Sequence, residues 1–285
     1  MALTVQESFE EFIKKISISC DCSNKIEERT NLVIRLLSNK FDVLEIFAVG
    51  SLVTYTAIKD YVNIDIIVVL HYSKYIRKNP PLDLLKKIKR ILNSYKVEIT
   101  KNNTHAVKLK FKSAPNVNII PASRVSVDEK FSHYNIPSTD KDIWIASNPK
   151  IHTQQMRDLS IYKGQLVQII KEWNRQNLSY LSSFHIDNMA LTYKDDVNLD
   201  FAWHICKFFK HMYEVLENKM LNPNGLGSYV DDYLDEYSRV AVLELIDTMI
   251  TKIYNAWYDV YSDKPHKLPI ETYCECFGDR FPKYG

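Results

Sequence analysis

Five residues in the first half of the chain have the types and spacing of a phosphate and metal site. Gly50 and Ser51 follow an apolar segment, and Asn63 and Asp65 begin a second one, twelve residues after Ser51. Backbone N–H groups beside a small residue can cradle a phosphate. Side chains two apart on a strand share a face, so Asn63 and Asp65 are expected beside that cradle. Asn118, in a third apolar segment, is a further oxygen donor.

Each of these residues has an ordinary structural explanation when it is taken alone. A Gly-Ser at the end of a strand is commonly a turn, Asp65 could be a satisfied polar group, and Asn118 could cap a turn. Their combined spacing instead favours a hydrated Mg²⁺ or Mn²⁺ held by oxygen ligands beside the phosphate. Asp60 precedes the strand at an odd spacing from Asp65, so we do not expect it to be a ligand.

Short segments rich in β-branched residues predict the strands that carry these side chains. The alternation over Lys108–Lys112 is typical of a half-exposed strand. The predicted strands cover residues 42–49, 64–70, 96–101, 106–111 and 116–120. A capping box at Thr4–Glu7 opens a first helix, and further helices are predicted over 24–39, 52–58 and 82–93.

After Pro149 the apolar spacing becomes helical throughout, over residues 162–174, 184–191, 199–218 and 238–261. We therefore expect a mixed α/β domain over 1–149 and an all-helical domain over 150–285. Lys171 and Ser183 lie in the second of these. Without further information a lysine on an apolar helix snorkels to solvent, and Ser183 at a helix start is an N-cap.

Composition excludes several classes of protein. The 46% apolar and 25% charged residues exclude a disordered chain. Six glycines include only one G-x-G, at Gly225–Gly227, so the dinucleotide and P-loop motifs are both missing. A net charge of +2 argues against a polynucleotide partner, although it leaves a local basic groove open.

The sequence predicts a cytoplasmic chain with free thiols. No signal peptide or apolar stretch long enough for a membrane span is found, and five cysteines fit a reducing compartment. Two C-x-C pairs, Cys20–Cys22 and Cys274–Cys276, could share a metal. The usual zinc spacing is C-x₂-C, so free thiols are the favoured interpretation.

The pattern resembles the nucleotidyltransferases with a polymerase-beta-like core, and more narrowly the CD-NTase family, bacterial relatives of cyclic GMP-AMP synthase and oligoadenylate synthase. That family carries a Gly-Ser, two acidic residues one apart, and a third acidic residue on a later strand. Further segments fit the family in the same order along the chain: residues 56–59, 117–122, 144–149, 170–174, 182–187 and 277–282.

The resemblance implies an α/β (α+β) fold, with a mixed-sheet nucleotidyltransferase core and a helical, oligoadenylate-synthase-like C-terminal lobe. It assigns metal binding and catalysis to Asn63, Asp65 and Asn118, with Mg²⁺ or Mn²⁺ as cofactor. It also places Lys171 and Ser183 with Gly50 and Ser51 at the bound nucleotide. The implied reaction joins NTPs, such as ATP or GTP, into a cyclic di- or oligonucleotide. In anti-phage (CBASS) immunity this second messenger reaches a separate effector, and no membrane partner is implied.

Two of the three metal positions depart from the family pattern. Family members have Asp where this chain has Asn63 and Asn118, and only Asp65 is acidic. Because Mg²⁺ prefers charged oxygens, we predict an inactive or weakly active enzyme, whether the amides are engineered or natural. Two other interpretations stay open. The chain could be a natural, catalytically silent nucleotide-binding regulator, or a terminal nucleotidyltransferase that acts on RNA or protein.

Overall fold

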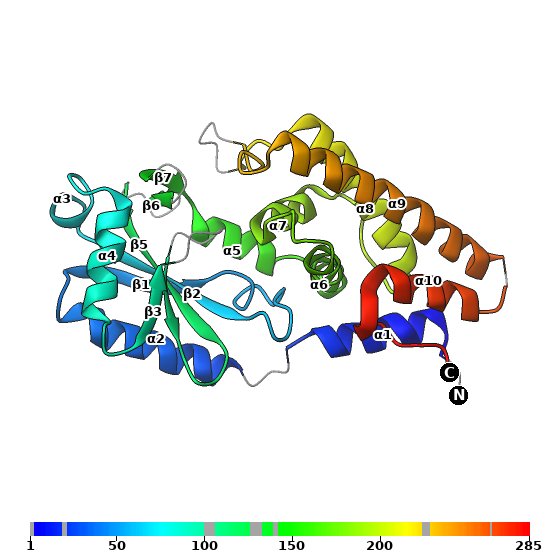
Figure 1. The fold of residues 1–285 in the computed structure, drawn as a ribbon, viewed down its shortest axis with the longest axis horizontal. Coiled ribbons are helices and arrows are strands. Elements are labelled where there is room, and N and C mark those ends of the chain that lie inside the picture. Colours follow the sequence, from blue (N-terminus) through cyan, green and yellow to red (C-terminus); the bar gives the residue numbers. More distant parts are fainter. Residues whose placement is uncertain are drawn as a thin grey trace. The chain divides into compact units, whose positions relative to one another are not determined.

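The computed structural model describes residues 3–18, 22–99, 106–125, 133–138, 142–223, 229–262 and 264–285. The chain folds into two compact units (Figure 1). A sheet unit covers residues 19–157, and a helical unit combines residues 1–18 with residues 158–285. Cys20 and the Gly225–Gly227 motif lie outside the described residues. No helix in the described ranges is both long enough and apolar enough to cross a lipid bilayer.

The sheet unit is built on a mixed sheet, which confirms the predicted fold class. Its strands are β1 (Val43–Val49), β2 (Asn63–Leu70), β3 (Lys96–Ile99), β4 (Val107–Lys110), β5 (Asn116–Arg124), β6 (Tyr134–Ser138) and β7 (Ile143–Ser147). They run in the order β1-β2-β5-β4-β3, and β6 pairs with both β5 and β7. The central pair β2–β5 is parallel, whereas the other pairs are antiparallel.

The two faces of the central strands differ in chemistry. Ile64, Ile66 and Val68 of β2 point to one face and are fully buried. The alternate residues point to the other face, where Ile67 and Val69 join a core cluster with Val49, Ala122 and Tyr134. Asn63 and Asp65 belong to this second face at the beginning of β2. Packing of Ile67 and Val69 therefore fixes the position of β2 and of the polar residues at its beginning.

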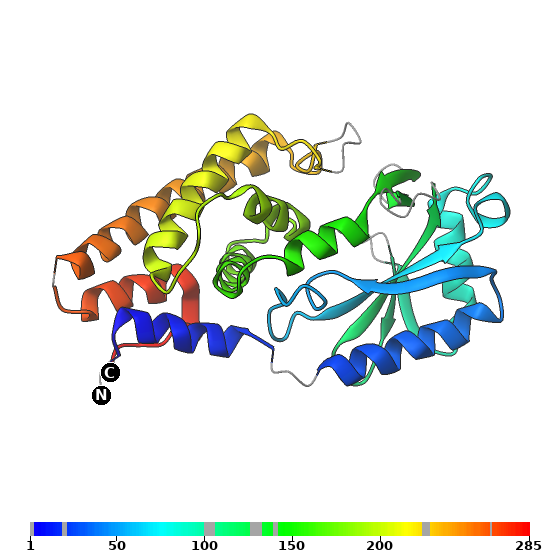
Figure 2. The same ribbon diagram turned by 180° about the vertical axis from the view of Figure 1, so that it is seen from behind.

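Four helices complete the sheet unit: α2 (Cys22–Ser38), α3 (Tyr72–Tyr75), α4 (Pro81–Ile91) and α5 (Pro149–Arg157). Figure 2 shows α2 and α4 beside the sheet, where α2 contacts β1, and α4 contacts β3 and β4. The predicted boundary after residue 149 differs from the compact units, because α5 belongs with the sheet. Lys150 of α5 pairs with Glu45 of β1, which explains this attachment.

Two local expectations in the sheet unit are wrong. The predicted helix over 52–58 is a run of turns, in which the N–H groups of Val53 and Thr54 donate to the carbonyl oxygen of Gly50. Tyr55 adopts a positive φ of 60°, which ends any helical path. Strands β6 and β7 were also missed; in β6, Pro137 and polar residues interrupt the β-branched pattern.

The helical unit contains α1 (Val5–Ile16), α6 (Ile161–Gln176), α7 (Ser183–Thr192), α8 (Phe201–Asn218), α9 (Glu236–Tyr261) and α10 (Lys267–Phe277). Helix α1 begins at the predicted capping box, with Thr4 as its N-cap. Its buried Phe9 and Phe12 pack against the rings of Phe277 and Phe281. This aromatic contact joins α1 to the helical unit. The predicted division after residue 149 instead assigns α1 to the first domain.

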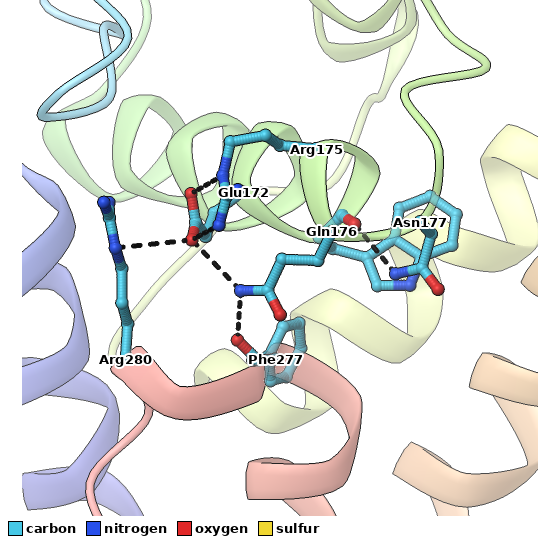
Figure 3. A network of polar contacts seen from close by, with 7 residues as sticks. Glu172, Arg175, Gln176, Asn177, Phe277 and Arg280 are labelled. Atoms are coloured by element: carbon cyan, nitrogen blue, oxygen red, sulfur yellow. Dashed lines mark hydrogen bonds and ion pairs between the residues drawn. The ribbon is translucent and has the colours of Figure 1, made fainter.

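Hydrogen bonds and an ion pair attach segment 277–282 to α6 (Figure 3). Glu172 is fully buried and accepts two hydrogen bonds from Arg175 and one from Gln176. Gln176 also donates to the carbonyl oxygen of Phe277 at 2.5 Å. At Gly278 φ is +72°, and a Cβ would lie 1.9 Å from the Gln176 amide oxygen. The glycine of this segment is therefore required by close packing.

Candidate functional site

The predicted phosphate cradle lies at the end of β1, directly against the strand that carries the carboxylate. Gly50 has a φ of +82°, and a Cβ at this position would lie 2.4 Å from Oδ2 of Asp65. The residue must therefore be glycine for both backbone and packing reasons. Within the described part of the chain, the backbone N–H groups of Ser51 and Leu52 donate no hydrogen bond. They are free to bind an anion beside Asp65.

Asp65 and Asn118 are neighbours across the parallel strands β2 and β5. They lie directly opposite in the register, and Nδ2 of Asn118 donates to Oδ1 of Asp65 at 2.7 Å. Asp65 is half-buried at the beginning of β2, and this burial raises the pKa of its carboxyl group to about 6. The hydrogen bond from Asn118 and the positive charge of Lys108 act in the opposite direction. At neutral pH the site therefore holds an ionised carboxylate whose burial is offset only in part by Asn118 and Lys108.

Asn63 and Ser51 occupy the expected positions at the margin of this pair. Asn63 is the first residue of β2 and lies opposite Asn116 of β5, on the face that also carries Asp65. Both Asn63 and Ser51 are half-buried. The structure thus brings Gly50, Asp65 and Asn118 into contact and leaves Asn63 and Ser51 beside them. Their metal and nucleotide roles stay predictions.

The side chains at this site carry oxygen donors of the kind that magnesium takes. Asn118 is 3% exposed, and its Oδ1 atom has no hydrogen-bond partner among the described residues. A cation would satisfy this buried oxygen. Mg²⁺ in proteins is commonly held by one or two carboxylates together with substrate phosphates. One carboxylate, Asp65, with the amide oxygens of Asn63 and Asn118 meets that requirement, but it supplies too little negative charge for two divalent ions.

Lys171 and Ser183 belong to the helical unit. Nζ of Lys171 lies 2.7 Å from Oδ1 of Asp187, and both side chains are buried. The expectation of a solvated lysine is therefore wrong, because Lys171 has a carboxylate partner in its own unit. The N-cap of α7 is Ser182, whose hydroxyl accepts from the N–H of His185, so the assignment of Ser183 as the cap is also wrong. Nucleotide binding by Lys171 and Ser183 stays a prediction.

The other candidate metal groups receive no support from the described residues. Nowhere in these ranges do three or more His, Cys, Asp or Glu side chains gather closely enough to hold an ion. Cys206, Cys274 and Cys276 are free thiols. His185 is buried, and burial lowers its pKa to about 4. Its Nδ1 lies 3.1 Å from the hydroxyl of Tyr233, which is consistent with a structural role.

Lys108 lies beside the site, although no sequence pattern predicted this position. In the register of β4 and β5, Lys108 lies directly opposite Asn118. The alternating pattern of β4 correctly indicated a half-exposed side chain, but the pairing of β4 with β5 is what places it next to the site. Asn116, whose Oδ1 accepts from the N–H of Phe111, was likewise not recognised.

Comparison with known proteins identifies the family. Residues 3–159, more than half of the chain, match the family model of the Second Messenger Oligonucleotide or Dinucleotide Synthetase (SMODS) domain. The chain belongs to the SMODS family. This match includes every strand of the sheet unit and the whole Gly50–Asp65–Asn118 cluster, and it confirms the predicted resemblance to the CD-NTases.

A curated relative of this SMODS chain is distant in sequence. A probable cyclic nucleotide synthase of Bacillus cereus (strain VD146) is 24% identical over 175 residues, which cover 58% of this chain and 51% of that protein. This chain therefore matches about half the length of its curated relative.

Several solved structures cover nearly the whole SMODS chain. Escherichia coli MS115-1 CdnC with ATP is 16% identical, with a TM-score of 0.75 and coverage of 98% of this chain and 99% of that one. Bradyrhizobium diazoefficiens CD-NTase CdnG with GTP is 15% identical, with a TM-score of 0.76 and coverage of 97% and 95%. At such identities the likeness establishes a shared fold.

Proposed function

We propose that this chain binds nucleoside triphosphates at the Gly50–Asp65–Asn118 site and is built to join them into a cyclic di- or oligonucleotide. The observation that carries the proposal is the contact of the Gly50 turn and the Asn118 amide with one carboxylate. The ATP and GTP complexes of CdnC and CdnG support nucleotide binding by this fold. The relative from B. cereus, a probable cyclic nucleotide synthase, supports the type of product.

Each residue of the site has a distinct part in this reaction. The free N–H groups of Ser51 and Leu52 bind and orient the phosphates, since backbone donors at a tight turn favour anions. The carboxylate of Asp65 and the amide oxygens of Asn63 and Asn118 would hold Mg²⁺. When bound, this ion lowers the pKa of the attacking hydroxyl and neutralises charge on the phosphates. We place the reaction in the cytoplasm, with the product acting on a separate effector in anti-phage defence.

The two amides make this chain a slow or silent version of such an enzyme. Replacing a carboxylate by an amide removes an attraction of about 4 kcal/mol between unit charges 4 Å apart at an effective dielectric of 20. Nucleotide binding through backbone N–H groups does not need that charge.

The decisive experiment compares this chain with the variant Asn63→Asp/Asn118→Asp. Both are incubated with the four NTPs and Mg²⁺ or Mn²⁺, treated with phosphatase, and analysed by chromatography, because a cyclic product has no terminal phosphate. We expect the double variant to gain orders of magnitude in rate and either single variant to gain less. Adding Asp65→Asn to the double variant should abolish the product.

The same experiment separates the alternatives. Equal activity of the chain and the double variant would refute the metal assignment of Asn63 and Asn118. Labelling of only RNA or protein by the double variant would favour a terminal nucleotidyltransferase. Nucleotide binding without a product from any variant would identify a silent regulator.

A further inference from the structure

Helix α4 presents a basic stripe, Leu82, Lys86 and Lys89, to solvent. The three residues are exposed and follow one another at intervals of four and three residues, so they share one face of the helix. Residues 72–91 hold seven Lys and Arg but one acidic residue, Asp83, although the whole chain carries a net charge of only +2. Oδ1 of Asp83 lies 3.9 Å from Nζ of Lys86, and in the described ranges Lys89 forms no ion pair. The surplus of positive charge is therefore local and largely uncompensated.

Helix α9 presents an acidic stripe, Val240, Glu244 and Asp247, with the same intervals of four and three residues. These residues are also exposed and share one face of their helix. The two cations of α9, Arg239 and Lys252, are engaged by other carboxylates. Within the part of the chain that the structure describes, Glu244 and Asp247 form no ion pair. This stripe therefore carries uncompensated negative charge.

The two stripes match position by position. Each begins with an exposed apolar residue, Leu82 at 38% and Val240 at 47% exposure, and continues with two charged residues four and seven positions later. Equal intervals along two α-helices give equal axial distances, at about 1.5 Å per residue. When such helices lie side by side and parallel with Leu82 against Val240, both lysines of the basic stripe meet carboxylates of the acidic stripe. The apolar pair removes nonpolar surface from water at one end of the contact.

Both stripes are held in place by the opposite faces of their helices. Leu85 and Ile88 of α4 are buried, and this helix contacts β3 and β4. Val242 and Ile246 of α9 are buried, and this helix contacts α8 and α10. A contact between the stripes therefore orders no backbone that is not already ordered, which lowers the entropic cost of association.

We propose that a second copy of this chain binds the basic stripe through its own acidic stripe. A nucleic acid would satisfy the basic stripe alone and would leave the acidic stripe without a partner. The two stripes belong to different units, α4 to the sheet unit and α9 to the helical unit (Figure 1). The contact is therefore heterologous: each copy in a pair keeps one unused stripe, so further copies add to form rings or open chains. This inference does not depend on the proposed function.

Sedimentation velocity over about 5–200 µM protein in about 50 mM NaCl tests the contact. The sedimentation coefficient of the chain should rise with concentration, and about 0.5 M NaCl should remove the rise because it screens exposed charges. Lys86→Glu/Lys89→Glu and Glu244→Lys/Asp247→Lys should each stay monomeric, because like charges then oppose one another. An equimolar mixture of the two variants should associate about tenfold or more tightly than either alone, because each supplies the charges that the other needs.

The matched control is Glu27→Lys/Glu28→Lys, which reverses two exposed carboxylates of α2 and should associate like the chain. Thermal melts followed by circular dichroism check that each variant is folded. A sedimentation coefficient of the chain that does not change with concentration would overturn the proposal. A mixture that stays monomeric, or association of either reversed variant by itself, would also overturn it. No nucleotide enters these measurements, so the failure of the proposed function would leave them unchanged.

Discussion

Replacing Asp65 by Asn should stabilise the sheet unit at neutral pH and have little effect in acid. Burial raises the pKa of this carboxyl from its ordinary value of 3.8 to about 6. The folded state therefore binds the proton more tightly than the unfolded chain does. The stability that Asp65 contributes is fully present below pH 4 and is lost as the pH rises through 6. The substitution removes the charge and keeps an oxygen that accepts from Asn118.

The size of the effect follows from the shift. About two pKa units at about 1.36 kcal/mol per unit give roughly 3 kcal/mol at pH 7.5. Asp65→Asn should therefore raise the free energy of unfolding by up to about 3 kcal/mol at pH 7.5, by less at pH 6, and by almost nothing at pH 4.

Urea denaturation in EDTA at these three pH values, followed by circular dichroism, measures the difference. The matched control is Asp83→Asn on α4, an exposed carboxylate of the same unit, which should stay within about 0.5 kcal/mol at each pH. A gain that is the same at pH 4 and pH 7.5, or no gain at either, would refute a buried ionised carboxylate at this site.

Other substitutions test the remaining contacts. Gly50→Ala should cost about 1–3 kcal/mol of stability and abolish nucleotide binding, because its Cβ would overlap the Asp65 carboxylate at a positive φ; calorimetric titration with ATP checks this. Burial lowers the pKa of His185 to about 4. The free energy of unfolding should therefore fall by about 3 kcal/mol as the pH falls from 6.5 to 4. His185→Gln should remove this pH dependence in thermal melts. Lys171→Met should cost about 3–5 kcal/mol by leaving Asp187 buried without its cation, and Lys171→Met/Asp187→Leu should recover most of the loss in urea titrations.

The core of the site was predictable because it depends on the alternation of side chains along a strand and on one turn. Asn63 and Asp65 share a face for any strand that begins near residue 63, and Asn118 needed only a third strand nearby. The contact between Gly50 and Asp65 follows from the antiparallel pairing of β1 and β2, in which Val49 lies opposite Asp65. Rules that depend on local sequence therefore identified Gly50, Asp65 and Asn118, which are in contact in the structure.

The features that sequence reasoning missed depend on pairing between distant segments. Lys108 joins the site only through the register of β4 on β5, which no local pattern specifies. Helix α1 joins the helical unit because Phe9 and Phe12 meet aromatic rings more than 260 residues away in the sequence. Ser182 and Ser183 are equally good caps by type, and only the N–H of His185 selects Ser182.

The charges around Asp65 explain how a site with two amides can be stable without its ion. Three carboxylates converging on one point would repel one another and raise their own pKa values. Here Asn118 instead donates a hydrogen bond to Asp65, and Lys108 adds a positive charge one strand further along. The amide thus does part of what a cation would do for the carboxylate, and it leaves its own oxygen unsatisfied. A chain with carboxylates at 63 and 118 would need a divalent ion to reach the same balance, so folding and metal binding would be coupled there far more strongly than in this chain.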